Sequence, residues 1–449
     1  ARVYVTCNVL PRNNEVEAMR EYIGQLKDTG VDALIVSDIG VMLMAREVAP
    51  NLELHVSTQA GVTNYQAANA FYQLGARRVV LAREMDLQAV RDIRARIPDD
   101  LDIECFVHGA MCMAFSGRCL FSNYLTGRDG NHGECAQPCR WKYSIVEEKR
   151  PGQYFPIEQT KEGAYLFNSQ DMNMLAHIDD LLDSGATSLK IEGRSKSAYY
   201  IAAMTNAYKT AVDAYMVQRG FEEDGTVLKP FHDRVIRPSD PDYGKPETTD
   251  LIMEHADGAF AGKPDIATVP VASAGEPDDL SYHARSTRRK SNTAAEILPE
   301  GWYHAGVRPA EHVSLPDWLL DEPDKVAHRD YSTGFYYPEH KVQQSTDRSA
   351  YFRAWLVVGE VLSWSEEDGG RVTIMSRNKI EAGQEVEFVL PGAAPLAYTV
   401  PAGGFRDADG HWVESINNPA HVFSMPCPQE VPVNAAIRSR TKKPTLKAE

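Results

Sequence analysis

The residues best suited to chemistry are four of the seven cysteines, which lie within residues 104–143 in the pattern C-x6-C-x15-C-x3-C. Thiolates are soft ligands that select zinc, copper(I) or iron-sulfur clusters, and four of them complete a tetrahedral zinc site or a cubane cluster. Five glycines of this stretch let the backbone fold tightly and bring amide groups close to sulfur. We therefore predict a metal-binding loop, the Cys loop, with the ligands Cys112, Cys119, Cys135 and Cys139.

The spacing alone is compatible with a cluster, with zinc and with no metal. Structural zinc sites usually contain C-x2-C pairs, which this loop lacks, whereas iron-sulfur spacings are more varied. Without a metal, the thiols would be buried or paired in disulfides. Disulfides are disfavoured because a chain of 449 residues with few cysteines outside one loop is typical of intracellular proteins, so we expect a cytoplasmic location.

A second group of polar residues is the segment Lys190-Ile-Glu-Gly-Arg194, which places two cations and a carboxylate at an expected strand-to-helix turn. The N-terminus of a helix favours anions, and Gly193 lets the backbone approach a ligand closely. We therefore expect Lys190 and Arg194 to bind a carboxylate or a phosphate. The alternative is an ion pair between Lys190 and Glu192, with Arg194 in solvent.

Polar residues also follow other expected strands, where burial is costly unless they are paired. We select His108 and Glu192 as candidate catalytic residues, and Gln59 and Arg83 as candidate substrate-binding residues. For Arg83, a structural ion pair with Glu84 is the alternative.

Asp38 and Asp171 are expected to cap helices rather than to catalyse. The hydrolase signatures G-x-S-x-G and H-E-x-x-H are absent from the sequence. A cysteine nucleophile with His108 or His132 is an alternative to metal binding.

Residues 1–218 alternate short β-branched runs with amphipathic windows, which is typical of a parallel α/β sheet. The expected strands are Arg2–Val9, Ala33–Ser37, Leu52–Thr58, Arg78–Ala82, Asp102–His108, Tyr165–Asn168 and Ser188–Ile191. Helices are expected at Glu15–Thr29, Val41–Val48, Tyr65–Leu74, Leu87–Ile97, Met172–Ser184 and Ala198–Val217.

Seven strands are one or two short of a (β/α)8 barrel, and the chain opens directly in an apolar run. We therefore predict an N-terminally truncated TIM-like barrel, with a doubly wound open sheet as the competing fold. In both folds the functional site lies at the carboxyl ends of the strands, where the Cys loop begins.

The remaining chain is predicted to contain an insertion and a second domain. Residues 219–345 are rich in Pro, Asp and Gly and are predicted to form an irregular insertion and linker. Residues 346–449 contain short β-branched runs separated by turns, which predicts an all-β, barrel-like domain. The end of this domain is predicted to be a basic tail with Arg438, Arg440, Lys442, Lys443 and Lys447. Such a tail could contact a phosphate backbone, and the alternative is a frayed chain end.

The amino-acid composition limits the kinds of partner that the protein can bind. The sequence is 43% hydrophobic and 24% charged, as in ordinary globular proteins, and no apolar run approaches the length of a membrane span. A net charge of −16 disfavours general binding of DNA or RNA, but it is compatible with a local basic patch. We expect neither a membrane nor DNA as a partner.

The run Glu104-x-Phe106-x2-Gly109-Ala-Met-Cys112-x4-Gly117-x-Cys119-x-Phe121-Ser resembles the signature of the collagenase-like peptidase family U32, with Phe121 where a small aliphatic residue is usual. The later Cys135-x3-Cys139-Arg-Trp and Ser188–Arg194 segments are most similar to the branch of this family that hydroxylates tRNA. The resemblance covers residues 1–218 and 315–440.

The resemblance implies a [4Fe-4S] cluster on the four cysteines. It also implies oxygen-independent hydroxylation of the wobble uridine of tRNA to 5-hydroxyuridine, with the small organic acid prephenate as hydroxyl donor. Relatives within the family suggest two different substrates, ribosomal RNA and a ubiquinone precursor. The family name suggests a collagenase-like peptidase. A noncatalytic, metal-stabilised scaffold that binds RNA or protein is the competing hypothesis from outside the enzyme class.

Overall fold

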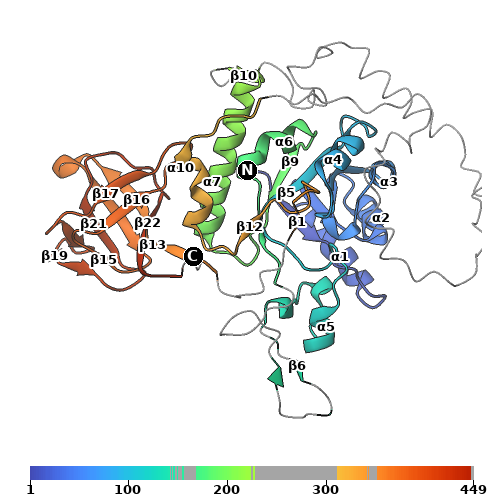
Figure 1. Ribbon diagram of the computed structural model, residues 1–449, viewed down its shortest axis with the longest axis horizontal. Helices are drawn as coiled ribbons and strands as arrows, with labels where there is room; N and C mark the ends of the chain where they lie inside the picture. Colours follow the sequence, from blue (N-terminus) through green and yellow to red (C-terminus); the bar gives the residue numbers. More distant parts are fainter. Residues whose placement is uncertain are drawn as a thin grey trace, which may run out of the picture.

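The computed structural model describes residues 1–141, 143, 145–146, 149, 154–155, 168–223, 226–227, 311–340, 342 and 351–445. These residues form an N-terminal α/β domain and a C-terminal domain of antiparallel strands, with the long helix α7 (Ala198–Gln218) between them (Figure 1). The predicted insertion lies mostly in residues 228–310, outside the described residues.

The N-terminal domain is built on one mixed sheet with the strand order β1-β2-β3-β4-β5-β8-β12, to which β9 is added beside β5. Strands β1 to β5 pair in parallel, β9 is parallel to β5, β8 is antiparallel to β5, and β12 is parallel to β8. The strands are β1 (Tyr4–Cys7), β2 (Ala33–Val36), β3 (Glu53–Val56), β4 (Ala76–Val80), β5 (Asp102–Ala110), β8 (Asp171–Asn173), β9 (Ser188–Ile191) and β12 (Tyr331–Ser332).

The parallel α/β sheet that the sequence predicts is confirmed. Within the described ranges, β1 and β12 lie at opposite ends of the hydrogen-bonded path and do not pair, so closure into a barrel is not confirmed. Strand β12 comes from the segment that the sequence assigned to a linker. The helix predicted at Met172–Ser184 begins later, because Met172 and Asn173, with Asp171, pair with β5 as β8.

Helices cover one face of this sheet. They are α1 (Val16–Leu26), α2 (Ile39–Val48), α3 (Tyr65–Gln73), α4 (Leu87–Arg94) and α6 (Ile178–Asp183). Alternate strand residues such as Leu34 and Ile103 share one buried core with helix residues such as Ile23 and Met42. The side chain of Asp38 accepts a hydrogen bond from Val41 N at 3.0 Å, so its predicted role as a helix cap is confirmed.

The C-terminal domain is a curled antiparallel sheet with the order β17-β16-β22-β13-β14-β21-β18-β19, around a core that includes Phe388, Phe405 and Phe423. Its strands are β13 (Arg353–Ser365), β14 (Arg371–Ser376), β16 (Glu385–Phe388), β17 (Leu396–Thr399), β18 (Phe405–Asp407), β19 (Trp412–Val413), β21 (Val422–Pro426) and β22 (Ala436–Thr445). The short strands β15 (Ile380–Glu381) and β20 (Ser415–Ile416) pair separately. The all-β prediction is confirmed, and a closed barrel is not.

The predicted basic tail is wrong for most of its residues. Residues 436–445 form β22, which lies between β16 and β13, so this segment is an interior strand. Arg438 is fully buried, whereas the exposed Lys442 contacts Glu381. Lys447 lies outside the described residues. The sequence shows a cluster of positive charges here, but strand pairing places alternate residues on opposite faces.

Arg438 joins the two domains. It donates to Glu322 at 2.6 and 2.7 Å and to Glu387 at 2.7 and 2.9 Å, and it also reaches the Tyr199 hydroxyl at 3.2 Å. Burial alone would lower the pKa of Arg438, but Glu322 and the other partners outweigh burial, and the pKa lies above its ordinary value. On the other side of the junction, the Asn206 amide bonds to the backbone of residues 390 and 392.

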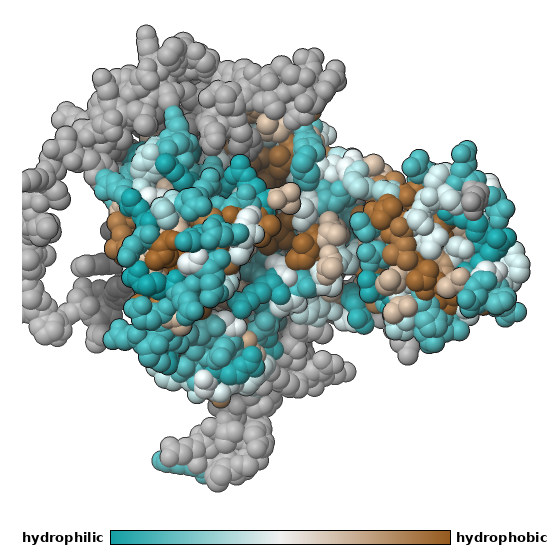
Figure 2. Space-filling view, turned by 180° about the vertical axis from the view of Figure 1, so that it is seen from behind, coloured by the Kyte–Doolittle hydropathy of each residue, from teal (hydrophilic) through white to brown (hydrophobic). Residues whose placement is uncertain are grey.

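The face of the described part that Figure 2 shows is mostly hydrophilic, with hydrophobic side chains gathered in groups over both domains. Several belong to the C-terminal domain, where Val433 is 57% exposed. Within the described residues, no helix combines the length and the apolar character that a bilayer crossing requires.

The Arg438→Ala variant should lose roughly 3–5 kcal/mol of stability, because it leaves buried carboxylates without their partner. Urea unfolding followed by tryptophan fluorescence measures this loss. Arg377→Ala is the matched control, since Arg377 pairs with Glu360 at 2.8 Å between side chains that are 49% and 36% exposed. It should change stability by less than about 1 kcal/mol. Equal effects of the two variants would contradict a special role of Arg438.

Candidate metal centre and substrate site

The Cys loop leaves the carboxyl end of β5, as predicted, and contains helix α5 (Phe121–Thr126) and two short 3-10 turns (Figure 1). All seven cysteines are free thiols. Cys112 and Cys135 are exposed, Cys119 and Cys139 are partly exposed, and the three cysteines outside the loop are buried. The thiols that can reach an added metal are therefore the four predicted ligands.

The four thiols are not gathered tightly enough to hold one zinc ion as they stand. In the described part of the chain, no three of the four sulfur atoms lie within 4.8 Å of one another. A tetrahedral zinc ion with bonds of about 2.3 Å requires sulfur atoms about 4 Å apart. A cubane holds its cysteine sulfurs further apart, because each binds a different iron. The backbone N–H of Gln137 donates to Cys135 Sγ at 3.4 Å, a contact of the kind that tunes cluster sulfurs.

Positive side chains surround the thiols. Burial raises the pKa of Cys139, and the charges of Arg140 and Arg329 act against this rise. Burial also raises the pKa of Cys112, and the charges of Arg83 and Arg140 act against this rise. Because thiols must lose their protons to bind a metal, these three arginines reduce the cost of loading the site.

Arg83 and Glu192, both predicted site residues, lie together. Arg83 Nη2 is 3.3 Å from Glu192 Oε2, and Arg83 Nη1 donates to the Ala110 carbonyl at 2.8 Å. The guanidinium lies 3.7 Å from the centre of the Phe106 ring. The alternative pair with Glu84 is wrong, because that carboxylate accepts from the backbone and hydroxyl of Ser116.

Gln59 and Arg194 contact the Cys loop at two of its glycines. A Cβ at Gly117 would lie 2.7 Å from Gln59 Cα, and a Cβ at Gly133 would lie 2.8 Å from Arg194 Nη2. Both glycines have positive φ, so they allow the turn as well as the close approach. The structure therefore brings four of the predicted residues, Gln59, Arg83, Glu192 and Arg194, to the loop.

Lys190 lies near Arg83, since its Nζ is 5.7 Å from the centre of the Phe106 ring on which the Arg83 guanidinium packs. Lys190 donates to Glu104 at 2.7 Å, on the face of the sheet opposite to the helices, where Arg78 and Ser188 also bind that carboxylate. Burial raises the pKa of Glu104, but Lys190 and Arg78 outweigh burial, and the pKa is lowered. The partner of Lys190 is thus Glu104 rather than Glu192, and its role toward a ligand stays a prediction.

His108 is buried in the protein interior. It is 1% exposed, its Nδ1 lies 3.3 Å from the Tyr208 hydroxyl, and its ring packs near Tyr200 and Tyr331. Burial lowers the pKa of His108 to about 3, so the imidazole is neutral near pH 7. Its Nε2 has no hydrogen-bond partner among the described residues. The catalytic role of His108 stays a prediction.

A buried ion pair that was not predicted from the sequence lies beside the site. Asp171, predicted to cap a helix, is 1% exposed on β8 and accepts from Arg329 at 2.6 and 2.9 Å. Arg329 also donates to Asn168 at 2.7 Å, and Lys196 lies 3.9 Å from Asp171. Arg329 and Asp171 are far apart in sequence. The only sequence signal for this pair is the group of charged residues in the segment His328-Arg-Asp-Tyr.

Comparison with known proteins gives the same assignment for both domains. Residues 1–238 match the model of peptidase family U32, and residues 353–438 match the model of the peptidase family U32 C-terminal domain. The chain belongs to peptidase family U32.

Within family U32, the similar relatives include proteins named for tRNA hydroxylation. The chain is 35% identical to "tRNA hydroxylation protein P" of Escherichia coli over 260 residues, which cover 49% of this chain and 57% of that protein. It is 42% identical to the Helicobacter pylori protein of the same name over 217 residues, or 48% of this chain and 51% of that one. Identity with "tRNA hydroxylation protein P1" of Bacillus subtilis is 27% over 427 residues, or 94% of this chain and 77% of that protein. The chain thus spans little more than half the length of the first two.

Gly117→Ala should loosen the Cys loop, because the new Cβ would collide with Gln59. Gly127→Ala is the matched control, since both glycines have φ +71° but nothing lies within 4 Å of a Cβ at Gly127. Both variants carry the cost of a positive φ, roughly 1–2 kcal/mol, and only Gly117→Ala adds a clash. Hydrogen exchange of peptides from residues 111–141 should therefore speed up more in Gly117→Ala. Equal exchange rates in the two variants would show that the close contact with Gln59 does not hold the Cys loop in place.

Proposed function

We propose that this protein hydroxylates the wobble uridine of tRNA to 5-hydroxyuridine, without oxygen, using a small dianionic acid such as prephenate as hydroxyl donor. The observation that carries the proposal is the placement of a four-cysteine loop against Arg83, Glu192 and Arg194 at one end of the sheet. Membership of family U32 and similarity to proteins named for tRNA hydroxylation support it.

The cofactor in this proposal is a [4Fe-4S] cluster bound by Cys112, Cys119, Cys135 and Cys139. The nearby arginines support a cluster, because its negative charge needs nearby cations. When bound, such a cluster supplies one-electron redox chemistry.

The side chains beside the loop would hold the donor. Arg83 is held in place by the Ala110 carbonyl, the Phe106 ring and Glu192, so its guanidinium is preorganised. Arg194 is exposed and can turn toward a ligand. We assign these two arginines to the two carboxylates of the acid, since a guanidinium binds a carboxylate through two parallel hydrogen bonds. Glu192, which accepts from Arg83 and from Arg194 N, is the candidate for proton transfer.

The contacts of the two candidate histidines disfavour the peptidase hypothesis. The cysteine nucleophile would need His108 or His132 as its base. His132 instead lies 3.0 Å from Asp129 and 3.5 Å from Glu15, and His108 contacts Tyr208. The partners of both histidines are thus carboxylates or a phenol.

Mass spectrometry of tRNA nucleosides tests the function directly. A strain that lacks this gene should lack 5-hydroxyuridine in its tRNA, and the reintroduced gene should restore it. If loss of the gene instead removed a hydroxyl group from ribosomal RNA or from a ubiquinone precursor, that molecule and not tRNA would be the substrate.

The four loop cysteines should each be needed for iron. Single Cys→Ala variants at these positions, purified without oxygen, should lose most of their iron and sulfide. Cys427→Ala is the control, because Cys427 is buried in the C-terminal domain and should not affect iron. Iron loss on replacement of Cys7 or Cys105 would mean that the ligand set is wrong.

Arg194→Ala should weaken binding of the acid about tenfold to a hundredfold, because one charge-assisted contact contributes about 1.5–3 kcal/mol. Arg194→Lys should restore part of this affinity, since an ammonium cannot form two parallel bonds to a carboxylate. Iron content should stay unchanged in both. Arg128→Ala, another exposed arginine of the Cys loop, is the control and should bind normally. If cells with the Arg194→Ala variant made a normal amount of 5-hydroxyuridine when the donor acid is scarce, Arg194 would not belong to the donor-binding site.

A further inference from the structure

A cavity of about 750 Å³ lies between the two domains, and we call it the interdomain cleft. Its walls come from five parts of the chain: the end of the Cys loop at residues 136–141, the start of α7 at residues 195–200, the segment 325–327, the start of β13 at residues 351–357, and Asn378. The size suits a ligand as large as a nucleotide. Neither domain contains this cleft by itself.

The lining of the interdomain cleft is positive. It includes four cations, and none of the described residues that line it carries a carboxylate. The cations are Arg140, Lys196, Lys325 and Arg353. The N-terminus of α7, capped by Ser197, adds a partial positive charge. In a chain of net charge −16, such a lining is a local exception and favours an anionic ligand.

Two of these cations are available to a ligand. Arg353 is exposed and pairs with no carboxylate in the part of the chain that the structure describes. Arg140 donates to the Tyr351 hydroxyl at 2.9 Å, while its buried Nε has no hydrogen-bond partner among the described residues. A phosphate in the cleft could accept hydrogen bonds from both guanidiniums.

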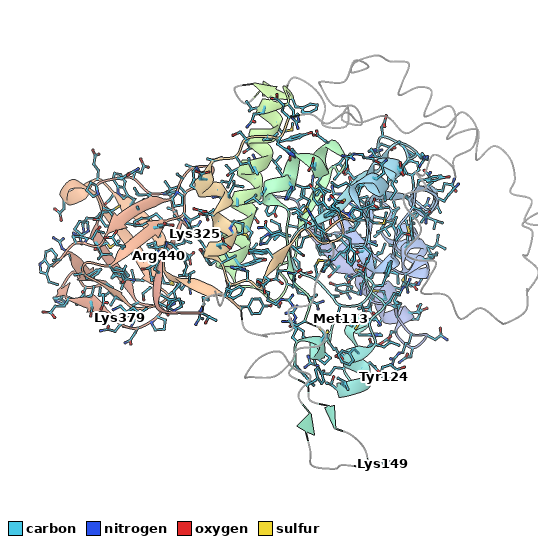
Figure 3. All side chains as sticks on the ribbon, in the orientation of Figure 1. Met113, Tyr124, Lys149, Lys325, Lys379 and Arg440 are labelled. Atoms are coloured by element: carbon cyan, nitrogen blue, oxygen red, sulfur yellow. The ribbon has the colours of Figure 1, made fainter. Side chains whose placement is uncertain are left out.

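Aromatic rings alternate with the cations. Trp141 is 44% exposed, and Lys196 Nζ lies 4.2 Å from the centre of the Tyr351 ring. Trp355 lies 5.4 Å from Lys325 and 5.1 Å from Arg440. Figure 3 shows Lys325 and Arg440 close together on the side of the C-terminal domain that faces α7. Interleaved rings and cations are typical of surfaces that stack unpaired bases and bind the adjacent phosphates.

We propose that the interdomain cleft binds a single-stranded segment of the RNA substrate, with Trp355 and Trp141 stacking on bases and Arg353 and Arg140 binding phosphates. The inference rests on the proposed function, which requires an unpaired uridine. Arg140 follows the ligand Cys139 directly, so a strand in the cleft would pass beside the metal centre. The C-terminal domain therefore completes the RNA-binding site.

Fluorescence anisotropy of a labelled anticodon stem-loop RNA with the full chain tests the proposal. Trp355→Ala should weaken binding roughly tenfold or more, and Trp355→Phe should restore part of it, because a smaller ring still stacks. Arg353→Ala should reduce the slope of log K against log salt by about one. Trp412→Ala is the matched control, since Trp412 is a 60% exposed tryptophan of the same domain with Arg406 over its ring, and it should bind like the wild type.

The possible results separate this inference from the proposed function, because binding is measured without turnover. Absence of RNA binding by the wild type, or unchanged binding by the Trp355 and Arg353 variants, would overturn the inference. Loss of prephenate binding in these variants with RNA binding intact would assign the cleft to the acid and overturn it as well. Cleft-dependent RNA binding by a protein that makes no 5-hydroxyuridine would support the inference and overturn the proposed function.

Discussion

The buried guanidinium of Arg438 determines how the two domains sit together. A charge without solvent is costly unless it is paired, and Arg438 meets this requirement only where Glu322 of the linker and Glu387 of the C-terminal domain converge. This pairing therefore stabilises the arrangement of the domains that the structure shows. The interdomain cleft owes its shape to this pairing, because its walls belong to both domains.

Close backbone contacts position the Cys loop in a comparable way. Gly117 and Gly133 let the loop approach Gln59 and Arg194, and at Gly109 a Cβ would lie 2.5 Å from the Glu192 carbonyl. Gly117 and Gly133 thus bring the loop, and Gly109 the end of β5, against residues that the sequence had marked as candidates for substrate binding or catalysis. The backbone contacts at Gly117 and Gly109 are direct, whereas at Gly133 the Arg194 guanidinium reaches the loop, and together they hold the loop near the strand ends.

The positive charges of the two domains serve two purposes. Some are neutralised inside the sheet, where Lys190 and Arg78 pair with Glu104. Others lie at the strand ends and in the cleft, where Arg140 and Arg353 lack carboxylate partners among the described residues. An acidic protein can thus offer a positive surface at one place, because local pairing rather than net charge sets the potential there.

The sequence by itself determined the features that depend on neighbouring residues. The Cys loop, the alternation of strands and helices, and the cap at Asp38 follow from spacing and local hydrogen bonding, and all three are present in the structure. The cofactor, the donor and the substrate rest on family resemblance, since spacing alone left several metals open.

The tertiary structure decided the pairings between distant segments. It placed Arg329 on Asp171, buried Arg438 in an interior strand and gave Lys190 a partner on β5 instead of one in its own turn. It also added β12 to the sheet. The sequence around a charged residue does not identify the residue with which it pairs. Which charges meet depends on how distant strands pair and which face each side chain takes, and these are properties of the folded chain alone.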